Sequence, residues 1–200
     1  MNHRNIAMGV VFAAALGVHV PKAAAQAGET DVGEVSGRVG GTWGGGSNGL
    51  SGVSNYTVGA SSGVAFARHG MVFFDTLFMP LGIHTIQPWP APFSIDHSYL
   101  IDFGVDFQIR IPVKHRFAPY LIAGTGLLWD QIKTLPAIVD GVPLVRHFNQ
   151  FNGALHTGAG ARYYIGETWG IRPEVKVIVS KQVYTSVSFG VFYVTPWNWP

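Results

Sequence analysis

Apolar positions alternate with largely polar ones along one segment of the chain, from Leu100 to Ile111. A β-strand directs successive side chains to opposite faces, so this segment predicts a strand with one apolar and one largely charged face. Its length is close to the ~9–11 residues that a tilted strand needs to cross a bilayer. The apolar face carries Ile101, Phe103, Val105, Phe107, Ile109 and Ile111, and the other face carries Leu100, Asp102, Gly104, Asp106, Gln108 and Arg110. The apolar face must meet either a protein core or lipid.

Similar patterns recur along the chain, most clearly from Trp169 to Val179. The 26 glycines, the low charged fraction of 12% and the lack of a long amphipathic helical pattern all favour an all-β protein. We expect eight strands, at Glu34–Trp43, Tyr56–Phe66, Met71–Met79, Tyr99–Ile111, Phe117–Trp129, Phe151–Tyr164, Trp169–Val179 and Tyr184–Val194.

Short and long connections alternate between these strands. The short ones are Ala67–Gly70, Pro112–Arg116 and Ile165–Thr168, and the long ones are Gly44–Asn55, Pro80–Ser98 and Asp130–Gln150. Only the last connection, Ser180–Val183, breaks the rule by being short at the end where a long one is expected. Transmembrane up-and-down barrels have this rhythm, with short turns in the periplasm and longer loops outside.

The N-terminus has the features of a secretory signal peptide. Arg4 lies in a short polar start, residues 6–20 are mostly apolar, and small residues follow. The apolar stretch is shorter than the ~20 residues of a spanning helix, which favours cleavage after Ala25 or Ala27 over a membrane anchor. We therefore divide the chain into a signal peptide (1–25), a short lead (26–33), a barrel (34–194) and a C-terminal tail (195–200).

Charge and cysteine content exclude several functions. Loss of Arg4 and Lys22 with the signal peptide leaves 11 basic residues against 11 acidic ones, so the mature chain is formally neutral and shows no sign of binding nucleic acid. The absence of cysteine excludes disulfides, thiol chemistry and a lipid-anchored cysteine.

The apolar faces of the eight strands carry no charged residue, and two arrangements can explain this. In a soluble exported β-barrel the charges would face water, whereas in a membrane barrel they would line the lumen and the apolar faces would meet lipid. Aromatic residues at the strand ends, and a polar face rich in glycine and poor in lysine, favour the membrane barrel.

The membrane barrel assigns residues to three groups. The lumenal charge network is Glu34, Arg38, Asp75, Asp102, Asp106, Arg110, Arg162, Arg172, Glu174 and Lys176. The lipid-facing residues are Ile101, Phe103, Val105, Phe107, Ile109, Val175, Val177 and Val179. The interfacial aromatics are Trp43, Trp129, Tyr163, Trp169 and Tyr193. Because charges held away from water are costly alone, we expect Asp102, Asp106 and Arg110 to pair with Arg162, Arg172, Glu174 and Lys176.

Most of the mature chain, and most strongly the part from Phe117 onward, resembles the small outer-membrane β-barrel domain family, which includes the transmembrane domain of outer-membrane protein A. The resemblance rests on Gly158–Ile165 followed by Trp169–Val175, and on Ala118–Gly126 before them. It implies an eight-stranded antiparallel barrel that is inserted by the barrel-assembly machinery. Such barrels often end on an aromatic residue, whereas this chain continues past Tyr193 with Thr195–Pro200.

A lipid-modifying barrel enzyme is the catalytic alternative. It needs a nucleophile, a histidine base and an acidic residue in contact. His156, Ser186 and Ser188 share the polar face, but no tight spacing unites them, so we expect His156 to be a lumenal hydrogen-bonding residue and the protein to lack a catalytic site.

The long loops offer candidates for binding. His84, His97 and His147 could meet over the barrel, but their spacing is not that of a metal site, and we expect neither metal nor cofactor. Trp89 and Phe93 are candidate contacts for a loop ligand, because binding residues concentrate on loops held by a rigid scaffold.

The sequence thus predicts an exported, monomeric barrel in the outer membrane of a Gram-negative-type bacterium. We expect a structural or loop-mediated binding role, or at most a very narrow pore, with outer-membrane lipid and an unidentified loop ligand as partners.

Overall fold

The computed structural model describes residues 32–45, 53–81, 85–86, 93–111, 116–134, 137–139, 142–144 and 147–196. The predicted signal peptide, most of the predicted lead and residues 197–200 of the tail lie outside this part of the chain. The main strands are β1 (Val32–Gly45), β2 (Val53–Ala67), β3 (Gly70–Leu81), β5 (Phe93–Arg110), β6 (Phe117–Thr134), β9 (His147–Tyr164), β10 (Trp169–Val179) and β11 (Val183–Pro196). Three short strands are β4 (Thr85–Ile86), β7 (Ala137–Val139) and β8 (Val142–Leu144).

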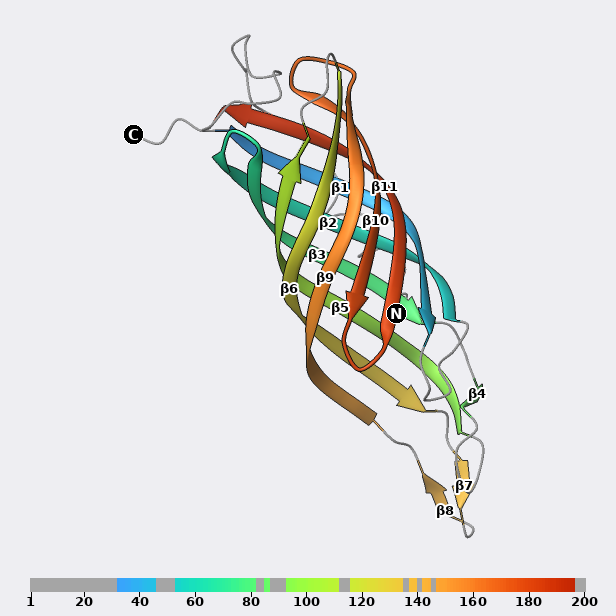
Figure 1. Ribbon diagram of the computed structural model, residues 1–200. Coiled ribbons are helices and arrows are strands. Elements are labelled where there is room, and N and C mark those ends of the chain that lie inside the picture. The colour runs from blue at the N-terminus through green and yellow to red at the C-terminus, as the bar shows by residue number, and fades with distance from the viewer. Residues whose placement is uncertain are drawn as a thin grey trace.

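The eight main strands form a closed antiparallel barrel (Figure 1). Each pairs with the next main strand along the chain, and β11 pairs back onto β1, where Val39 lies opposite Phe189. Closure leaves no unpaired edge along the body of the barrel, which a sheet in lipid requires. The predicted eight-stranded up-and-down barrel is therefore confirmed.

Several strands are longer than the sequence pattern predicts. Within the expected loop Asp130–Gln150, β6 continues to Thr134, β9 begins at His147, and β7 and β8 form a separate hairpin. The expected loop Pro80–Ser98 contains β4 and the start of β5. These segments lack strict alternation, and it is pairing with a neighbouring strand that extends them.

The two ends of the barrel differ, as Figure 1 shows. We call the upper end of the figure, with the β2–β3 and β9–β10 turns, the turn end, and the lower end, with β4 and the β7–β8 hairpin, the extended end. The two turns that the structure describes in full at the turn end are short, at residues 68–69 and 165–168. In the described residues, no helix is long and apolar enough to cross a membrane.

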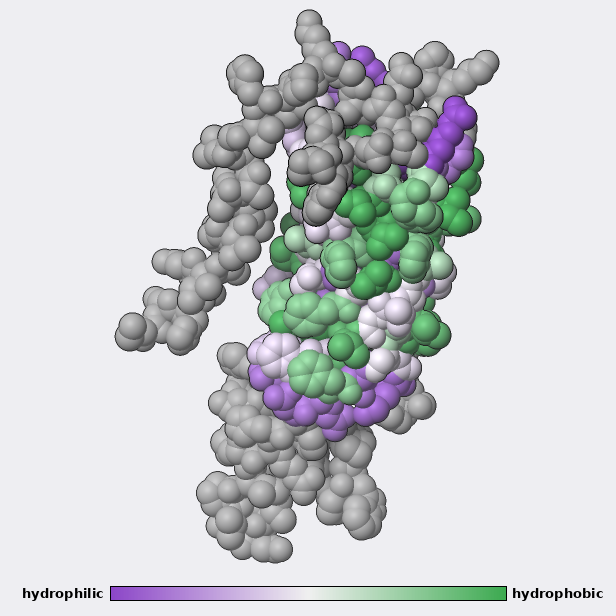
Figure 2. All heavy atoms as spheres, turned by 90° about the vertical axis from the view of Figure 1, so that its left-hand side faces the viewer, coloured by the Kyte–Doolittle hydropathy of each residue, from purple (hydrophilic) through white to green (hydrophobic). Residues whose placement is uncertain are grey.

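The barrel is apolar outside and polar inside, the reverse of a soluble barrel. On the face that Figure 2 shows, hydrophobic side chains cover the middle of the outer surface and hydrophilic ones lie near the ends. Along β10 buried residues alternate with exposed or half-buried ones, and the buried set is Gly170, Arg172, Glu174, Lys176 and Ile178. Period-two alternation therefore sorts the charged residues into the lumen.

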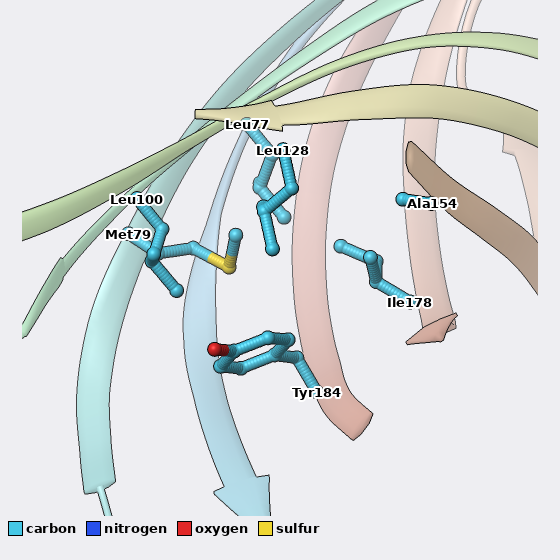
Figure 3. Packing of buried hydrophobic residues seen from close by; sticks show 7 residues of the cluster. All are labelled: Leu77, Met79, Leu100, Leu128, Ala154, Ile178 and Tyr184. Atoms are coloured by element: carbon cyan, nitrogen blue, oxygen red, sulfur yellow. The ribbon is translucent and has the colours of Figure 1, made fainter. Parts of the chain in front are cut away.

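The lumen is filled in three layers. At the extended end lies an apolar layer of Leu77, Met79, Leu100, Leu128, Ala154, Ile178 and Tyr184, whose side chains gather inside the ring of strands (Figure 3). At the turn end lies a second apolar layer of Val32, Ala118, Tyr164, Phe192 and Val194. The charged residues lie between them, as the inward order Ala154, His156, Arg162, Tyr164 along β9 illustrates.

Candidate functional site

The charged layer in the lumen is the main concentration of polar side chains in the described residues. All ten charged residues assigned to the lumen from the sequence are buried, each with 6% exposure or less. They come from β1 (Glu34, Arg38), β3 (Asp75), β5 (Asp102, Asp106, Arg110), β9 (Arg162) and β10 (Arg172, Glu174, Lys176). These strands lie on different sides of the barrel, so the side chains converge across the lumen rather than along one sheet face.

Lys176 is the centre of the half of this layer nearer the extended end. Its Nζ lies 2.6 Å from Oδ2 of Asp75, 2.8 Å from Oδ2 of Asp106 and 3.6 Å from Oδ2 of Asp102. Asp75 also accepts a hydrogen bond of 2.6 Å from Nη2 of Arg38, whose Nη1 donates to Glu174 over 3.1 Å. Three strands, β3, β5 and β10, are thus joined to β1 through charge-assisted hydrogen bonds, the stronger class of such bonds.

Arg172 is the centre of the half nearer the turn end. It donates to Oε2 of Glu174 over 2.6 Å and to Oε1 of Glu34 over 3.2 Å. Glu34 also accepts from Nε of Arg162 over 3.0 Å, and Arg162 donates to Gln108 over 2.7 Å. Ion pairs and hydrogen bonds therefore continue without a break from the Asp102 side of the lumen to Gln108.

Two aromatic side chains complete this half, and neither is among the lumenal residues expected from the sequence. The Tyr120 hydroxyl donates to Glu174 over 2.8 Å and accepts from Nε of Arg172 over 2.9 Å. The guanidinium of Arg162 lies 4.5 Å from the centre of the Tyr120 ring, and that of Arg172 lies 5.2 Å from the centre of the Phe73 ring. For Tyr120 the sequence signal is that residues 117–129 are apolar on both faces, which places an aromatic residue in the lumen.

His156 lies between two carboxylates. Its Nδ1 is 2.8 Å from Oδ1 of Asp106, and its Nε2 is 3.1 Å from Oδ1 of Asp102. Both ring nitrogens can donate at once only in the imidazolium form, and a ring in that form would satisfy both carboxylates. The serines of the enzyme alternative, Ser186 and Ser188, make no hydrogen bond to His156 in the described part of the chain.

Arg110 is the one expected member that makes no ion pair among the described residues. It is the last residue of β5 and lies opposite Tyr120 in the strand register. Its Nε and Nη2 are buried without a hydrogen-bond partner in the described chain. The ion-paired network itself holds five acids, four bases and His156.

Small residues make room for these long side chains. Gly104 and Gly126 lie opposite each other in the register of β5 and β6, and both border the His156 ring. A Cβ at Gly104 would lie 2.5 Å from Cε1 of His156, and one at Gly126 would lie 2.7 Å from the same atom. The imidazole therefore occupies space that only glycine leaves open.

We expect the substitution Gly104→Ala to destabilise the barrel by about 1–3 kcal/mol, because an added methyl group must displace the His156 ring from its carboxylates. Gly37→Ala is the matched control, since a Cβ there meets nothing within 4 Å. Urea unfolding in detergent micelles, followed by tryptophan fluorescence, measures both variants. Equal losses of stability in the two would contradict the packing role of Gly104.

The residues assigned to lipid lie on the outer surface. Phe103, Phe107, Ile109, Val175 and Val179 are exposed by 40% to 60%, and Ile101, Val105 and Val177 are half-buried between neighbours on the same face.

The aromatic residues assigned to the membrane interfaces fall at the two ends of the strands. Trp43 and Trp129 lie toward the extended end, and Tyr163, Trp169 and Tyr193 lie at the turn end. The Trp129 ring stacks on that of Phe151, with centres 5.6 Å apart. Amphipathic rings at both ends of an apolar band are the arrangement of a membrane barrel.

The loop candidates cannot be placed. His84 and Trp89, and the side chains of Phe93, His97 and His147, lie outside what the structure describes. Within the described residues, no group of three or more histidine, aspartate or glutamate side chains is arranged to hold a metal ion.

Comparison with known proteins agrees with this geometry. The chain resembles the crystal structure of Neisserial surface protein A, with a TM-score of 0.57 and 14% identity over 80% of this chain and 96% of that one. It also resembles the N-terminal β-barrel domain of Pseudomonas aeruginosa OprF, with a TM-score of 0.52 and 14% identity over 82% and 98% of the two chains. The attachment invasion locus protein Ail of Yersinia pestis gives a TM-score of 0.52 and 11% identity over 83% and 99%. A search of curated protein sequences finds no match.

At these identities the solved structures establish the fold alone. The sequence comparison goes further, because residues 10–195 match the family described as the outer membrane protein β-barrel domain. With that match, and with its closed eight-stranded barrel, the chain belongs to the outer membrane β-barrel domain family and is a protein of the Gram-negative outer membrane.

Proposed function

We propose that this protein is a closed, non-catalytic outer membrane barrel that serves as a rigid base for binding at its extended end. The observation that carries the proposal is the three-layered lumen. Two apolar layers enclose an ion-paired layer, so the interior is packed with side chains rather than filled with water. Eight strands leave an interior just wide enough for such filling.

The ion-paired layer supports a structural role rather than conduction. Arg38 and Arg172 from β1 and β10 share Glu174, and Lys176 of β10 reaches across the lumen to Asp75 and Asp106 on the adjacent strands β3 and β5. These contacts brace the barrel across its lumen. A diffusing ion would have to break several buried charge-assisted bonds, which makes even a narrow pore unfavourable.

Catalysis is not supported either, because His156 is fully committed to Asp102 and Asp106 inside the barrel. The apolar outer face supports contact with outer-membrane lipid in a single barrel inserted by the assembly machinery. The short turns then face the periplasm, and the extended end faces outside, as is usual for this architecture. Binding residues are expected there, where long segments stand on a rigid scaffold.

We expect the purified protein, reconstituted in planar lipid bilayers, to show no large or stable conductance. A porin measured in the same apparatus provides the positive control. Heat modifiability on an SDS gel, comparing boiled with unboiled samples, shows that the reconstituted protein is folded. Stable conductance steps from folded protein would contradict the closed lumen and favour a pore.

A further inference from the structure

At the extended end of the barrel, neighbouring strands end at different heights. β10 ends at Val179, which pairs with Leu155 of β9, whereas β9 itself begins at His147. Residues 147–154 of β9 therefore pair with β6 on one side and continue past the end of β10 on the other (Figure 1). We call the side of residues 147–153 that faces away from β6 the β9 edge.

The phase of the strand shows which backbone groups this edge presents. The carbonyl of Ala154 accepts from Oγ1 of Thr125 on β6, whereas the carbonyl of Gly153 accepts from Oγ of Ser180, just after β10. Backbone groups alternate in direction along a strand, so the N–H and C=O of Asn149 and Phe151 point away from β6. Within the described residues, no strand pairs with them there.

On the other side of the extension, the edge of β5 is covered by a short strand. There β5 continues past the end of β3 and pairs with β4, where Thr85 lies opposite Ser94. The β9 edge also lacks the devices that normally protect a free edge, since its sequence His-Phe-Asn-Gln-Phe-Asn-Gly has no proline, lysine or acidic residue. Its composition is that of a segment that readily accepts another strand.

The β9 edge is already held in an extended conformation. The Asn149 side chain accepts from Nε1 of Trp129 over 2.5 Å, and Asn152 donates to Asp130 over 2.8 Å. Lys181 donates to Gln150 over 2.9 Å from the β10–β11 turn. Because this segment is ordered before binding, less conformational entropy is lost when another strand adds to it.

From this geometry we propose that the β9 edge binds an extended segment of another protein by adding it to the sheet as an antiparallel strand. The proposal rests on the proposed function, because it states which kind of partner the extended end binds. That partner is an extended peptide without charge in its middle and with an acidic residue at the end nearest Lys181. Backbone hydrogen bonds supply the affinity in strand addition, and side chains supply the selection.

A second copy in the same membrane does not fit this edge. Antiparallel pairing of two identical strands relates them by a two-fold axis perpendicular to the sheet. The barrel wall stands across the membrane, so this axis lies in the membrane plane and would invert the second copy. A segment from a different, soluble or surface-anchored protein meets no such constraint.

A synthetic peptide tests the proposal directly. The probe is acetyl-Glu-Thr-Val-Thr-Val-Thr-amide with a fluorophore on an added terminal lysine, and its binding to the folded barrel in detergent micelles is followed by fluorescence anisotropy. Two further probes carry N-methyl groups on alternate residues. If the edge bonds as proposed, one methylated peptide binds like the parent and the other does not. Equal binding of both, or no binding of the parent up to ~1 mM, the weak limit of specific association, would overturn the proposal.

Variants of the barrel locate the site. Asn149→Pro removes an outward N–H without removing a backbone hydrogen bond to β6, so it should weaken probe binding about tenfold or more. Asn149→Ala keeps that N–H while losing the contact with Trp129, and should bind within about threefold of the parent protein. If both variants bind the probe equally well, the edge is not the site.

Amide hydrogen exchange of the unmodified protein gives a second measurement that needs no variant. Without peptide, the amides of Asn149 and Phe151 should exchange faster than those of Gln150 and Asn152, and bound probe should slow them selectively. Unchanged exchange at Asn149 and Phe151 with saturating probe would also overturn the proposal. The bilayer recordings test the closed lumen independently, so failure of one proposal is distinguishable from failure of the other.

Discussion

Replacing Arg172 with methionine is expected to lower the free energy of unfolding by about 3–5 kcal/mol, the usual cost of removing one partner from a buried ion pair. Arg172 is 2% exposed and bonds Glu174, Glu34 and the Tyr120 hydroxyl. Its loss leaves one negative charge in excess between two apolar layers, where water cannot compensate for it. Urea unfolding of the protein in phospholipid vesicles, followed by tryptophan fluorescence, measures the change.

Two controls separate the ion pair from a general effect of losing an arginine. Arg116→Met removes an exposed arginine side chain whose only described bond is a 3.4 Å contact with the Ile165 carbonyl, and should change stability by less than about 0.5 kcal/mol. The double variant Arg172→Met, Glu174→Gln restores charge balance and should cost less than the sum of its single changes. Additive losses would show that Arg172 and Glu174 are not energetically coupled.

The second large effect is expected on the outer surface, at Phe103. This residue is 45% exposed and lies near the middle of the paired part of β5, opposite Thr76 of β3 and Leu127 of β6. Lysine on the lipid face near the bilayer midplane costs roughly 2–4 kcal/mol. Phe103→Lys should therefore reduce the fraction of protein that reaches the heat-modifiable, membrane-inserted form, as measured by gel shift of outer-membrane extracts.

The control for Phe103→Lys places the same charge at the end of the strand. Ile111 is 48% exposed and follows β5 at the turn end, where lysine can reach the interface. Ile111→Lys should cost only about 0–1 kcal/mol and should assemble normally. If Phe103→Lys assembles as well as Ile111→Lys, the outward face does not contact the membrane interior.

The sequence was sufficient to predict the fold because the information needed is local. Alternation with a period of two assigns Asp106 and Lys176 to the lumenal face whatever their neighbours are. Short turns such as 165–168 then determine that consecutive strands are antiparallel. The strand extensions at Thr134 and His147 could not be predicted, because only pairing with a neighbour distinguishes them from a loop.

The contacts within the lumen were harder to predict than the faces. Lys176 reaches Asp75 and Asp106 across the barrel, and such contacts depend on strand register and tilt, which no local pattern contains. The apolar layers were hidden for another reason: Leu100 and Ile178 are single apolar residues on otherwise charged faces. Only the register shows that such residues from different strands meet at one level.

The ion-paired layer has a consequence for the lifetime of the folded protein. Its partners come from strands as distant in sequence as β1 and β10, so none of the pairs that cross the lumen can form before the barrel closes. Opening the wall at any point would disrupt all of these ion pairs together. The separated charges would gain little solvation energy until water reaches them. Because these contacts form after the main barrier to folding, they slow unfolding more than they speed folding. The protein should persist as a folded barrel by kinetic resistance, well beyond what its equilibrium stability alone would give.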